Sequence, residues 1–338
     1  MERMIGLLDI MTEDAQDVDK LYQPTNYFSY YSPKIMRELK KTGIENLRSK
    51  KNSFLSHFGA SDSQMDYFRV PKYCNYLPER FREYLVGKSL LSKEELQHLA
   101  YHQASYLDKI YNVNKLDEVS VSLEGNPADV FYMDSKPYTI SFLKYYLQYI
   151  YIRRFLDLDR IKIFVDHCCG MSKTSEIIHK LHPDVMILMF DIVPTVYITE
   201  RYMKSVFPRE VYGYATTKPL KNLEYDQGKI YVFPNWKIPI LDTLPSVDVF
   251  MDSAGFQEME YNVVANYLSF VKGKARYIYL RERTCGVNKA KKGKYGSINP
   301  VQLLDYISLL NNYEIINMEN SIIPLVSIDY TDMIMKKR

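Results

Sequence analysis

Five short runs of apolar residues recur along the C-terminal two thirds of the chain. Each run is apolar throughout rather than alternating with polar residues, and segments with helical periodicity separate most of them; the runs span residues 161–166, 185–191, 229–234, 247–252 and 275–280. Continuous apolar runs of this length are typical of parallel strands that are buried on both faces. Their alternation with helices predicts right-handed crossovers and a doubly wound, mostly parallel α/β sheet that begins near residue 160.

Further elements precede and follow these strands. Residues 138–156 predict a long buried helix, and residues 300–310 predict the last helix. Two strand-like segments, YEIINM and PLVSIDYTDMIM, then follow with only a short connection between them. This spacing predicts an antiparallel C-terminal strand pair that closes one edge of the sheet.

The chain before residue 115 is predicted to be mostly helical. Ser32–Pro33 is a typical helix start, because proline is tolerated at the first helical position, and Gly43 is a typical stop. A second helix is predicted to start at Ser92, with Glu95 three residues later in the capping-box position. Residues 56–78 between these helices predict a loop with short helices.

Composition narrows the class of protein. We divide the chain into a helical N-terminal region (1–135), expected to make acceptor-side or oligomer contacts, and an α/β domain (136–338). The formal net charge is only +3 and no block of like charge is long enough to serve as a nucleic-acid-binding arm, so we expect no nucleic-acid partner. No apolar run reaches about 18 residues, so we expect no membrane span. The four cysteines suit neither a disulfide framework nor a zinc site, which predicts reduced thiols, a cytoplasmic protein and no metal.

The ends of the first two strands carry candidate ligand-binding residues. The first strand ends in DHCCGMS, and the second ends in Asp191, 25 residues after Asp166. An acid at this spacing in a nucleotide-binding unit accepts hydrogen bonds from the ribose hydroxyls of a cofactor. Alternatively, Asp191 caps the helix that follows Pro194. The turn itself keeps one glycine, Gly170, so a turn that binds nothing is also open.

Four segments resemble the bacterial sugar O-methyltransferase family. They are FDIVPTVYITERYMKSVFP (190–208), SAGFQEMEYNVVANYL (253–268), TGIENLRS (42–49) and EGNP (124–127), and together the resemblance covers roughly residues 25–330. It implies a Rossmann-like sheet of the methyltransferase type and an S-adenosylmethionine-dependent enzyme that acts on a sugar of a surface polysaccharide or lipopolysaccharide.

The resemblance also assigns residues of the first two strand ends. Asp166 stands where the family has the glutamate of its Glu-x-Gly-x-Gly turn, Asp191 stands at the ribose-binding acid, and Gly170 matches one turn glycine. Cys168 and Cys169 replace small residues, which is a departure from the family pattern. The predicted cofactor-binding residues are Asp166, Cys168, Gly170, Asp191, Ile192 and Ser253.

The chemistry of methyl transfer suggests further residues. A sugar hydroxyl is a poor nucleophile and benefits from a general base, for which Glu258, Asp252 and His167 are candidates at the carboxyl ends of strands. Glu258 could equally cap a helix. The predicted substrate-binding residues are Gln257, Arg281 and Glu282. The last two begin a basic loop, residues 281–297, which is either a mobile lid for an anionic acceptor or a solvated surface loop.

Two other functions remain open from the sequence. An NAD-dependent sugar-nucleotide oxidoreductase or epimerase would need a fuller glycine pattern and a Tyr-x-x-x-Lys pair, and Tyr202 with Lys204 has the wrong spacing. A non-catalytic binding protein on a degenerate methyltransferase fold is supported by the glycine-poor turn. For the enzyme, the expected partner is a sugar acceptor, free or linked to a nucleotide or lipid, and a homo-oligomer is possible.

Overall fold

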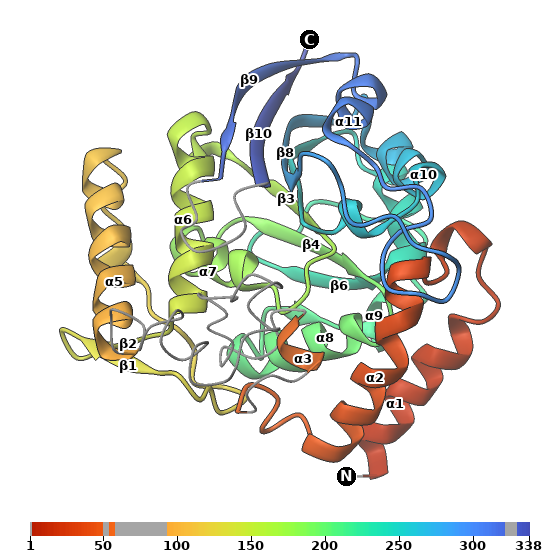
Figure 1. Ribbon diagram of the computed structural model, residues 1–338, viewed down its shortest axis with the longest axis horizontal. Coiled ribbons are helices and arrows are strands. Elements are labelled where there is room, and N and C mark those ends of the chain that lie inside the picture. Colours follow the sequence, from red (N-terminus) through yellow and green to blue (C-terminus); the bar gives the residue numbers. More distant parts are fainter. Residues whose placement is uncertain (1, 50–53, 58–92, 322–329) are drawn as a thin grey trace, which may run out of the picture.

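An eight-stranded sheet forms the centre of the molecule (Figure 1). The computed structural model describes residues 2–49, 54–57, 93–321 and 330–338. The strand order of the sheet is β5-β6-β4-β3-β7-β8-β10-β9, and the neighbouring strands from β5 to β8 are parallel. The five apolar runs form five of these strands, so the predicted doubly wound sheet is confirmed: β3 (Ile163–His167), β4 (Met186–Asp191), β6 (Ile230–Pro234), β7 (Val247–Ser253) and β8 (Ala275–Arg283).

The predicted antiparallel pair is also confirmed. It consists of β9 (Tyr313–Asn320) and β10 (Tyr330–Lys337), and β10 lies between β8 and β9. Because β10 continues the ladder as far as the pairing of Tyr330 with Arg283, β8 extends three residues beyond its predicted end at Leu280. A short strand that the sequence did not predict, β5 (Val211–Tyr212), forms the opposite edge.

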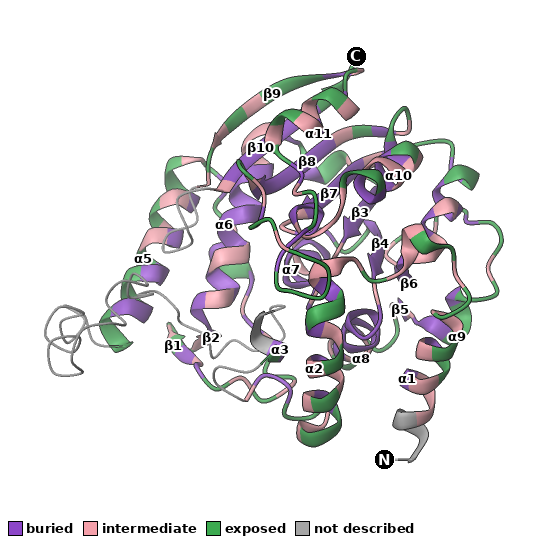
Figure 2. Cartoon of the chain, turned by 45° about the vertical axis from the view of Figure 1, so that its right-hand side comes forward, coloured by how far each residue is buried: buried purple, intermediate pink, exposed green. Residues whose placement is uncertain are grey.

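Alternate side chains of the strands enter two cores, one on each face of the sheet. Phe164 faces the core that contains α6 (Ile140–Phe155), α7 (Lys173–Leu181) and α8 (Thr195–Val206). Val165 faces the core that contains the 3₁₀ segment η5 (Asn235–Thr243), α10 (Tyr261–Val271) and α11 (Leu303–Leu309). Figure 2 shows that the strands between these layers are almost wholly buried, which is why their sequences are apolar on both faces.

Helix α6 is buried on nearly all sides because it lies between the sheet and α5 (Lys93–Ile110) (Figure 1). Its start is capped by Thr139, whose hydroxyl accepts the N–H of Phe142 at 3.1 Å. The hydroxyl of Tyr151 reaches the sheet and donates to the main-chain oxygen of Asp332 at 3.1 Å. The helix predicted over 138–156 is therefore confirmed.

The N-terminal region packs mostly on the same face as α6, although its Leu21 and Tyr22 pack against the core on the other face. It contains α1 (Glu2–Asp14), α2 (Asn26–Thr42) and α3 (Phe54–His57). The predicted start of α2 at Ser32–Pro33 is wrong, because burial of the stripe Phe28, Tyr31, Ile35 and Leu39 continues the helix through Pro33. The predicted stop is confirmed: Gly43 has φ +74° and its N–H donates to the oxygen of Leu39 at 3.0 Å.

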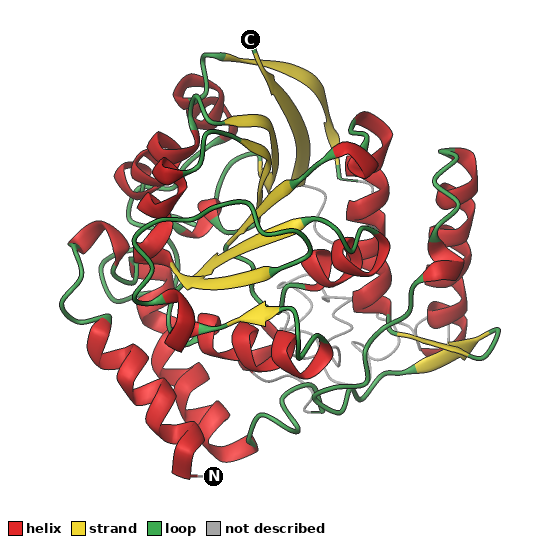
Figure 3. Cartoon of the chain, turned by 180° about the vertical axis from the view of Figure 1, so that it is seen from behind, coloured by secondary structure: helices red, strands yellow, loops and turns green. Residues whose placement is uncertain are grey.

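The start of α5 agrees with the prediction as far as the described residues reach, whereas most of the short connecting elements were not predicted. Helix α5 begins at Lys93, directly after the predicted start, but Ser92 and most of residues 56–78 lie outside the described residues. Figure 3 shows a two-stranded hairpin away from the main sheet. It and the remaining short elements were not predicted: β1 (Phe131–Met133), β2 (Lys136–Tyr138), α9 (Tyr214–Thr217), η1 (Lys20–Tyr22), η3 (Leu116–Glu118), η4 (Leu158–Arg160) and η6 (Phe256–Glu258). Among the described helices, none has the length and apolar character required to cross a bilayer.

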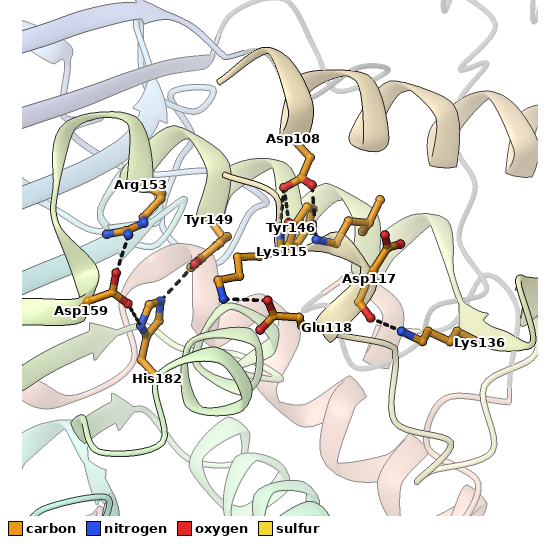
Figure 4. Close-up of polar contacts among 11 residues, drawn as sticks. Asp108, Lys115, Asp117, Glu118, Lys136, Tyr146, Tyr149, Arg153, Asp159 and His182 are labelled. Atoms are coloured by element: carbon orange, nitrogen blue, oxygen red, sulfur yellow. Dashed lines mark hydrogen bonds and ion pairs between the residues drawn. The ribbon is translucent and has the colours of Figure 1, made fainter. Parts of the chain in front are cut away.

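A group of paired polar side chains, which we call the α5–α6 network, joins α5, α6 and α7 (Figure 4). Asp108 accepts the hydroxyl of Tyr146 at 2.5 Å and the N–H groups of Lys115 and Leu116 at 3.2 and 3.4 Å. The ring of His182 contacts the hydroxyl of Tyr149 at 3.0 Å and the carboxylate of Asp159 at 3.1 Å. Asp159 also pairs with Arg153. Every one of these side chains has a partner, so the network fastens the helices to one another.

Candidate functional site

A cavity of about 180 Å³ lies at the carboxyl ends of β3, β4 and β7. The chain builds β4 and β6 on one side of β3 before it crosses to β7 on the other side. Such a switch point is where ligands bind in doubly wound sheets. The predicted site residues that line the cavity are Asp166, His167, Cys168, Gly170, Asp191, Ile192, Ser253 and Glu258.

The turn after β3 has the backbone of a glycine-rich turn although it holds one glycine. Cys168, Gly170 and Ser172 have φ values of +52°, +55° and +56°, in the left-handed region that glycine normally occupies. Room for the Cys168 side chain comes from Gly255, since a Cβ atom there would lie 2.3 Å from the Cβ of Cys168. The missing glycine of the first loop is thus compensated by a glycine in the loop after β7.

Asp191 connects the ends of β3 and β4. Its Oδ2 accepts the N–H of Gly170 and its Oδ1 accepts the N–H of Ile192, both at 2.7 Å. Each carboxylate oxygen has a second lone pair, and Asp191 lines the cavity. A pair of vicinal hydroxyls can therefore bind to it without displacing the main-chain donors.

Three acidic side chains line this cavity, and we call it the acidic cavity. Burial, with repulsion from Asp252 and other nearby acids, raises the pKa of Asp166 and of Glu258 to about 8 and that of Asp191 to about 6. Hydrogen bonds from the Ser175 hydroxyl to Asp166, at 2.6 Å, and from Tyr27 to Glu258 only partly offset the burial. Lys173 also lines the cavity, but burial lowers its pKa far below the usual value. A positively charged ligand would stabilise the ionised acids.

Asp252 lies behind the cavity wall and orients His167. Nδ1 of His167 is 2.5 Å from Oδ2 of Asp252, and both side chains are buried. Oδ1 of Asp252 accepts the N–H groups of Gly255 and Phe256 at 2.9 and 3.0 Å, which fixes the carboxylate. An acceptor at this place holds the proton of His167 on Nδ1 and leaves Nε2 with a free lone pair. His167 is thereby prepared to accept a proton at Nε2.

The three predicted substrate-binding residues do not line the cavity. Because β8 continues to Arg283, Arg281 and Glu282 are still within the sheet, opposite Asp332 and Thr331. Glu282 accepts the N–H of Gln257 at 3.0 Å, and burial together with the neighbouring Asp252 raises its pKa. The side chain of Gln257 donates to the hydroxyl of Tyr330 and accepts the N–H of Arg283, both at 2.9 Å. Gln257 therefore fastens the loop after β7 to the sheet.

Several lining residues come from segments that carry no motif. Thr25 is an example: its hydroxyl donates to the main-chain oxygen of Glu258 at 2.9 Å, so the start of α2 is fastened over the carboxyl edge of the sheet. No sequence signal linked Thr25 to this edge, because it lies 233 residues before Glu258 in the chain. The lining residues not predicted include Gln23, Thr25, Phe28, Tyr145, Cys169, Lys173, Thr174, Thr195, Asn235 and Tyr267.

The basic loop after β8 lies outside the cavity lining. Asn26 donates to the main-chain oxygens of Lys294 and Gly296 at 2.9 and 2.7 Å and accepts the N–H of Gly293. Glu260 accepts the hydroxyl of Ser297 at 2.8 Å. The side chains of Lys291, Lys292 and Lys294 are exposed. The structure thus shows an anchored loop with solvated lysines.

One group of possible metal ligands occurs within the described residues. One atom each of His167, Cys168 and Asp252 lie within 4.8 Å of one another. Because the short contact between His167 and Asp252 already joins two of the three, these side chains are arranged as a hydrogen-bonded pair. The expected absence of a metal stays a prediction. The described cysteines Cys168, Cys169 and Cys285 are free thiols.

Comparison with known proteins gives similarity at a low level. Neither a family model nor a curated protein sequence matches the chain. Solved structures similar to it include the pyocyanin biosynthetic protein PhzM, with 13% identity over 59% of this chain and 57% of PhzM and a TM-score of 0.40. Mitomycin 7-O-methyltransferase MmcR has 10% identity, 71% and 67% coverage and a TM-score of 0.39. Magnesium protoporphyrin IX methyltransferase from Synechocystis PCC 6803 has 9% identity, 70% and 99% coverage and a TM-score of 0.40.

These values describe a partial likeness. The chain spans 57% of the length of PhzM and 67% of that of MmcR. The identities are too low to assign an activity, and the TM-scores are too low to equate the folds.

Proposed function

We propose that the protein is an S-adenosylmethionine-dependent O-methyltransferase that acts on a sugar hydroxyl. The observation that carries this proposal is the acidic cavity at the switch point, with Asp191 at the end of β4. Asp191 binds the ribose hydroxyls through its free lone pairs. The turn at Cys168 and Gly170 lines the cavity, and its left-handed backbone lets the main chain approach the cofactor closely.

The charge of the cavity suits this cofactor. Burial and repulsion from nearby acids raise the pKa values of Asp166 and Glu258, and the attraction of Arg283 for Glu258 only partly offsets this. When bound, S-adenosylmethionine supplies a methyl carbon whose bond to a positively charged sulfur breaks with the electron pair staying on sulfur. The buried carboxylates therefore attract the cofactor in its charged form and bind the neutral product S-adenosylhomocysteine less strongly.

His167 is the general base of the proposed reaction. Asp252 holds its proton on Nδ1, so Nε2 takes the proton of the acceptor hydroxyl as that oxygen attacks the methyl carbon. Asp252 positions His167 and stabilises the imidazolium that forms. Glu258 lines the cavity and is the alternative base. Ordering the acceptor and the donor in one cavity supplies much of the remaining acceleration.

A sugar is the acceptor class that the sequence resemblance supports, with surface polysaccharide or lipopolysaccharide biosynthesis as the setting. Aromatic side chains in the lining, among them Phe28, Tyr145 and Tyr267, offer flat apolar surfaces for a pyranose ring. The sugar assignment is tested by methyl transfer from labelled S-adenosylmethionine to a panel of sugars and nucleotide-linked sugars. Transfer to phenols or amines but to no sugar would overturn it.

The cofactor assignment is tested by calorimetric titration of the full-length protein with S-adenosylmethionine and S-adenosylhomocysteine. We expect one saturable site for each, and Asp191→Ala should weaken binding roughly 10- to 100-fold, because hydrogen bonds to a charged group are lost. Asp184→Ala is the matched control, since Asp184 is exposed at the opposite end of β4. It should bind as the wild type does.

A folded protein that binds neither ligand would contradict the enzyme and favour the binding protein on a degenerate fold. Binding of NAD in place of S-adenosylmethionine would favour the oxidoreductase. Circular dichroism on each variant separates loss of binding from loss of fold.

A further inference from the structure

Beyond the acidic cavity, two cationic side chains meet where the start of α6 crosses the end of β8. Gln148 of α6 donates to the hydroxyl of Tyr279 of β8 at 3.1 Å. Lys144 lies one helical turn before Gln148, on the same face of α6. Arg281 lies two residues after Tyr279, on the same face of β8. The C-terminal end of α6 leads into the start of β3, so α6 runs opposite to β3. Strand β8 is parallel to β7, which is parallel to β3, so α6 also runs opposite to β8. Lys144 and Arg281 therefore come together.

The surroundings of Arg281 leave part of its guanidinium without a partner. The side chain is buried, its Nε donates to the hydroxyl of Ser321 at 3.2 Å, and the guanidinium lies 4.2 Å from the centre of the Tyr330 ring. The nearest carboxylate oxygen, Oδ1 of Asp332, is 3.9 Å from Nε and accepts the hydroxyl of Tyr279 at 2.6 Å. Nη2 is buried and has no hydrogen-bond partner among the residues that the structure describes. A buried cationic donor of this kind is costly unless a ligand satisfies it.

Lys144 adds a second positive charge at the same place. Within the described part of the chain its ammonium group has no ion pair or hydrogen bond, and burial together with the nearby Arg281 lowers its pKa to about 8. Opposed cations of this kind repel each other until an anion lies between them. One carboxylate, Asp332, does not balance both.

The next residue on α6, Tyr145, lines the acidic cavity. Ser253, which pairs with Arg281 in the sheet, lines it as well, whereas Lys144 and Arg281 do not, so the cationic pair lies beside the cavity. Asp191 ends β4 and Arg281 lies in β8 opposite Ser253, the last residue of β7, so the two are three strand spacings apart, or about 14 Å across the sheet. Cys168 after β3 and Ser253 of β7 line the cavity between these two strands, so we place the rest of a cofactor bound to Asp191 over β3 and β7. The pair is placed for a group carried by the second substrate.

We propose that Lys144 and Arg281 bind a phosphate or carboxylate group of the methyl acceptor. The planar guanidinium offers a forked pair of donors and the ammonium offers a point charge, which together suit an oxyanion. This inference rests on the proposed function and narrows the acceptor to an acidic or phosphorylated one. Arg281, which was predicted as a substrate contact from its place after the strand, would act from within the sheet.

The experiment titrates the full-length protein with inorganic phosphate and, separately, with S-adenosylhomocysteine and 5′-methylthioadenosine. We expect saturable phosphate binding that Lys144→Met and Arg281→Met each weaken roughly tenfold or more, in line with loss of a hydrogen bond to a charged group. Both variants should bind the two nucleosides as the wild type does. Arg276→Met, at an exposed position of the same strand, should bind phosphate normally.

Phosphate binding that is absent from the wild type, or unchanged in both variants, would overturn the inference. Weaker binding of S-adenosylhomocysteine but not of 5′-methylthioadenosine would also overturn it, because the anion would then be the donor's carboxylate. Arg281→Lys keeps the charge and serves as a second variant if Arg281→Met does not fold. Failure of nucleoside binding with intact phosphate binding would instead contradict the proposed function and leave the anion site standing.

Discussion

The α5–α6 network and the acidic cavity both contain buried polar groups, but they differ in how those groups are satisfied. In the network, Asp108 accepts three donors and His182 contacts a partner through each ring nitrogen. In the cavity, Asp166 and Glu258 have raised pKa values because their hydrogen bonds do not offset burial and repulsion. Buried polar groups that are fully paired stabilise the fold, whereas buried groups whose loss of hydration is not offset by partners are available to bind a ligand. The comparison predicts that changes in the network lower stability and that changes in the cavity alter binding.

The largest effect is expected from Asp108→Ala in the network. The substitution leaves the Tyr146 hydroxyl and two main-chain N–H groups without an acceptor, and the free energy of unfolding should fall by about 4 kcal/mol. Urea unfolding measures this change. Asp117→Ala, at an exposed position nearby, should change it little. S-Adenosylhomocysteine should bind the folded fraction of Asp108→Ala normally, and a large loss of affinity there would erase the distinction between the two regions.

The second prediction concerns the fit between the two loops at the cavity. Gly255→Ala places a Cβ atom against Cys168 and should destabilise the protein by about 3 kcal/mol through overpacking. Cys168→Gly removes the obstructing side chain and also relieves the left-handed backbone at this position. The double variant should therefore regain most of the lost stability. A double-mutant cycle by urea unfolding measures this coupling, and strictly additive effects would contradict the compensation between the loops.

The third prediction uses the raised pKa of Asp166. A folded pKa of about 8 against an unfolded value near 3.8 contributes stability that is complete below the unfolded value and is lost as the pH rises through 8. Without ligand, the wild type should become less stable between pH 5 and 8.5. Asp166→Asn should reduce this fall by about 2 kcal/mol. Thermal unfolding across this pH range tests the prediction, and parallel curves for the two proteins would contradict it.

The same groups predict how binding depends on pH. A cationic ligand favours ionised Asp166, Asp191 and Glu258, so S-adenosylmethionine should bind more strongly as the pH rises from 6 to 8.5. S-Adenosylhomocysteine lacks the sulfonium charge and should show a shallower slope. Calorimetry in two buffers of different ionisation enthalpy measures the protons released. Equal slopes for the two ligands would remove the electrostatic argument for the cofactor.

The sequence predicted the sheet because its strands are buried on both faces and therefore form continuous apolar runs. It predicted the end of β4 and the turn after β3 as site positions because chain order alone puts both at the switch point. The fifth apolar run was predicted to end at Leu280, but pairing with β10 keeps Arg281 and Glu282 in the sheet as part of β8. Local sequence cannot reveal such tertiary pairing.

The rest of the site depends on contacts between distant segments. Thr25 and Phe28 reach the cavity only because burial of Phe28 and Tyr31 starts α2 at Asn26, six residues before the predicted Ser32–Pro33 start. The left-handed backbone at Cys168 depends on Gly255, 87 residues later. Lys144 was assigned to a buried helix, and its meeting with Arg281 follows from how α6 crosses the sheet.

The smallest effect is expected from His182→Gln, which tests the contribution of the α5–α6 network to stability at acid pH. Burial lowers the pKa of His182 despite the adjacent Asp159, so its contribution to stability is present above the unfolded value and is lost as the pH falls through the folded one. The buried His179 titrates in the same direction. His182→Gln should therefore flatten the acid side of the stability curve by about 1 kcal/mol or less and leave the alkaline side unchanged. Thermal unfolding between pH 4.5 and 7 measures this. Asp166→Asn is the variant for comparison, because it should instead change the loss of stability as the pH rises. If His182→Gln altered the alkaline side instead, the two regions would not titrate independently.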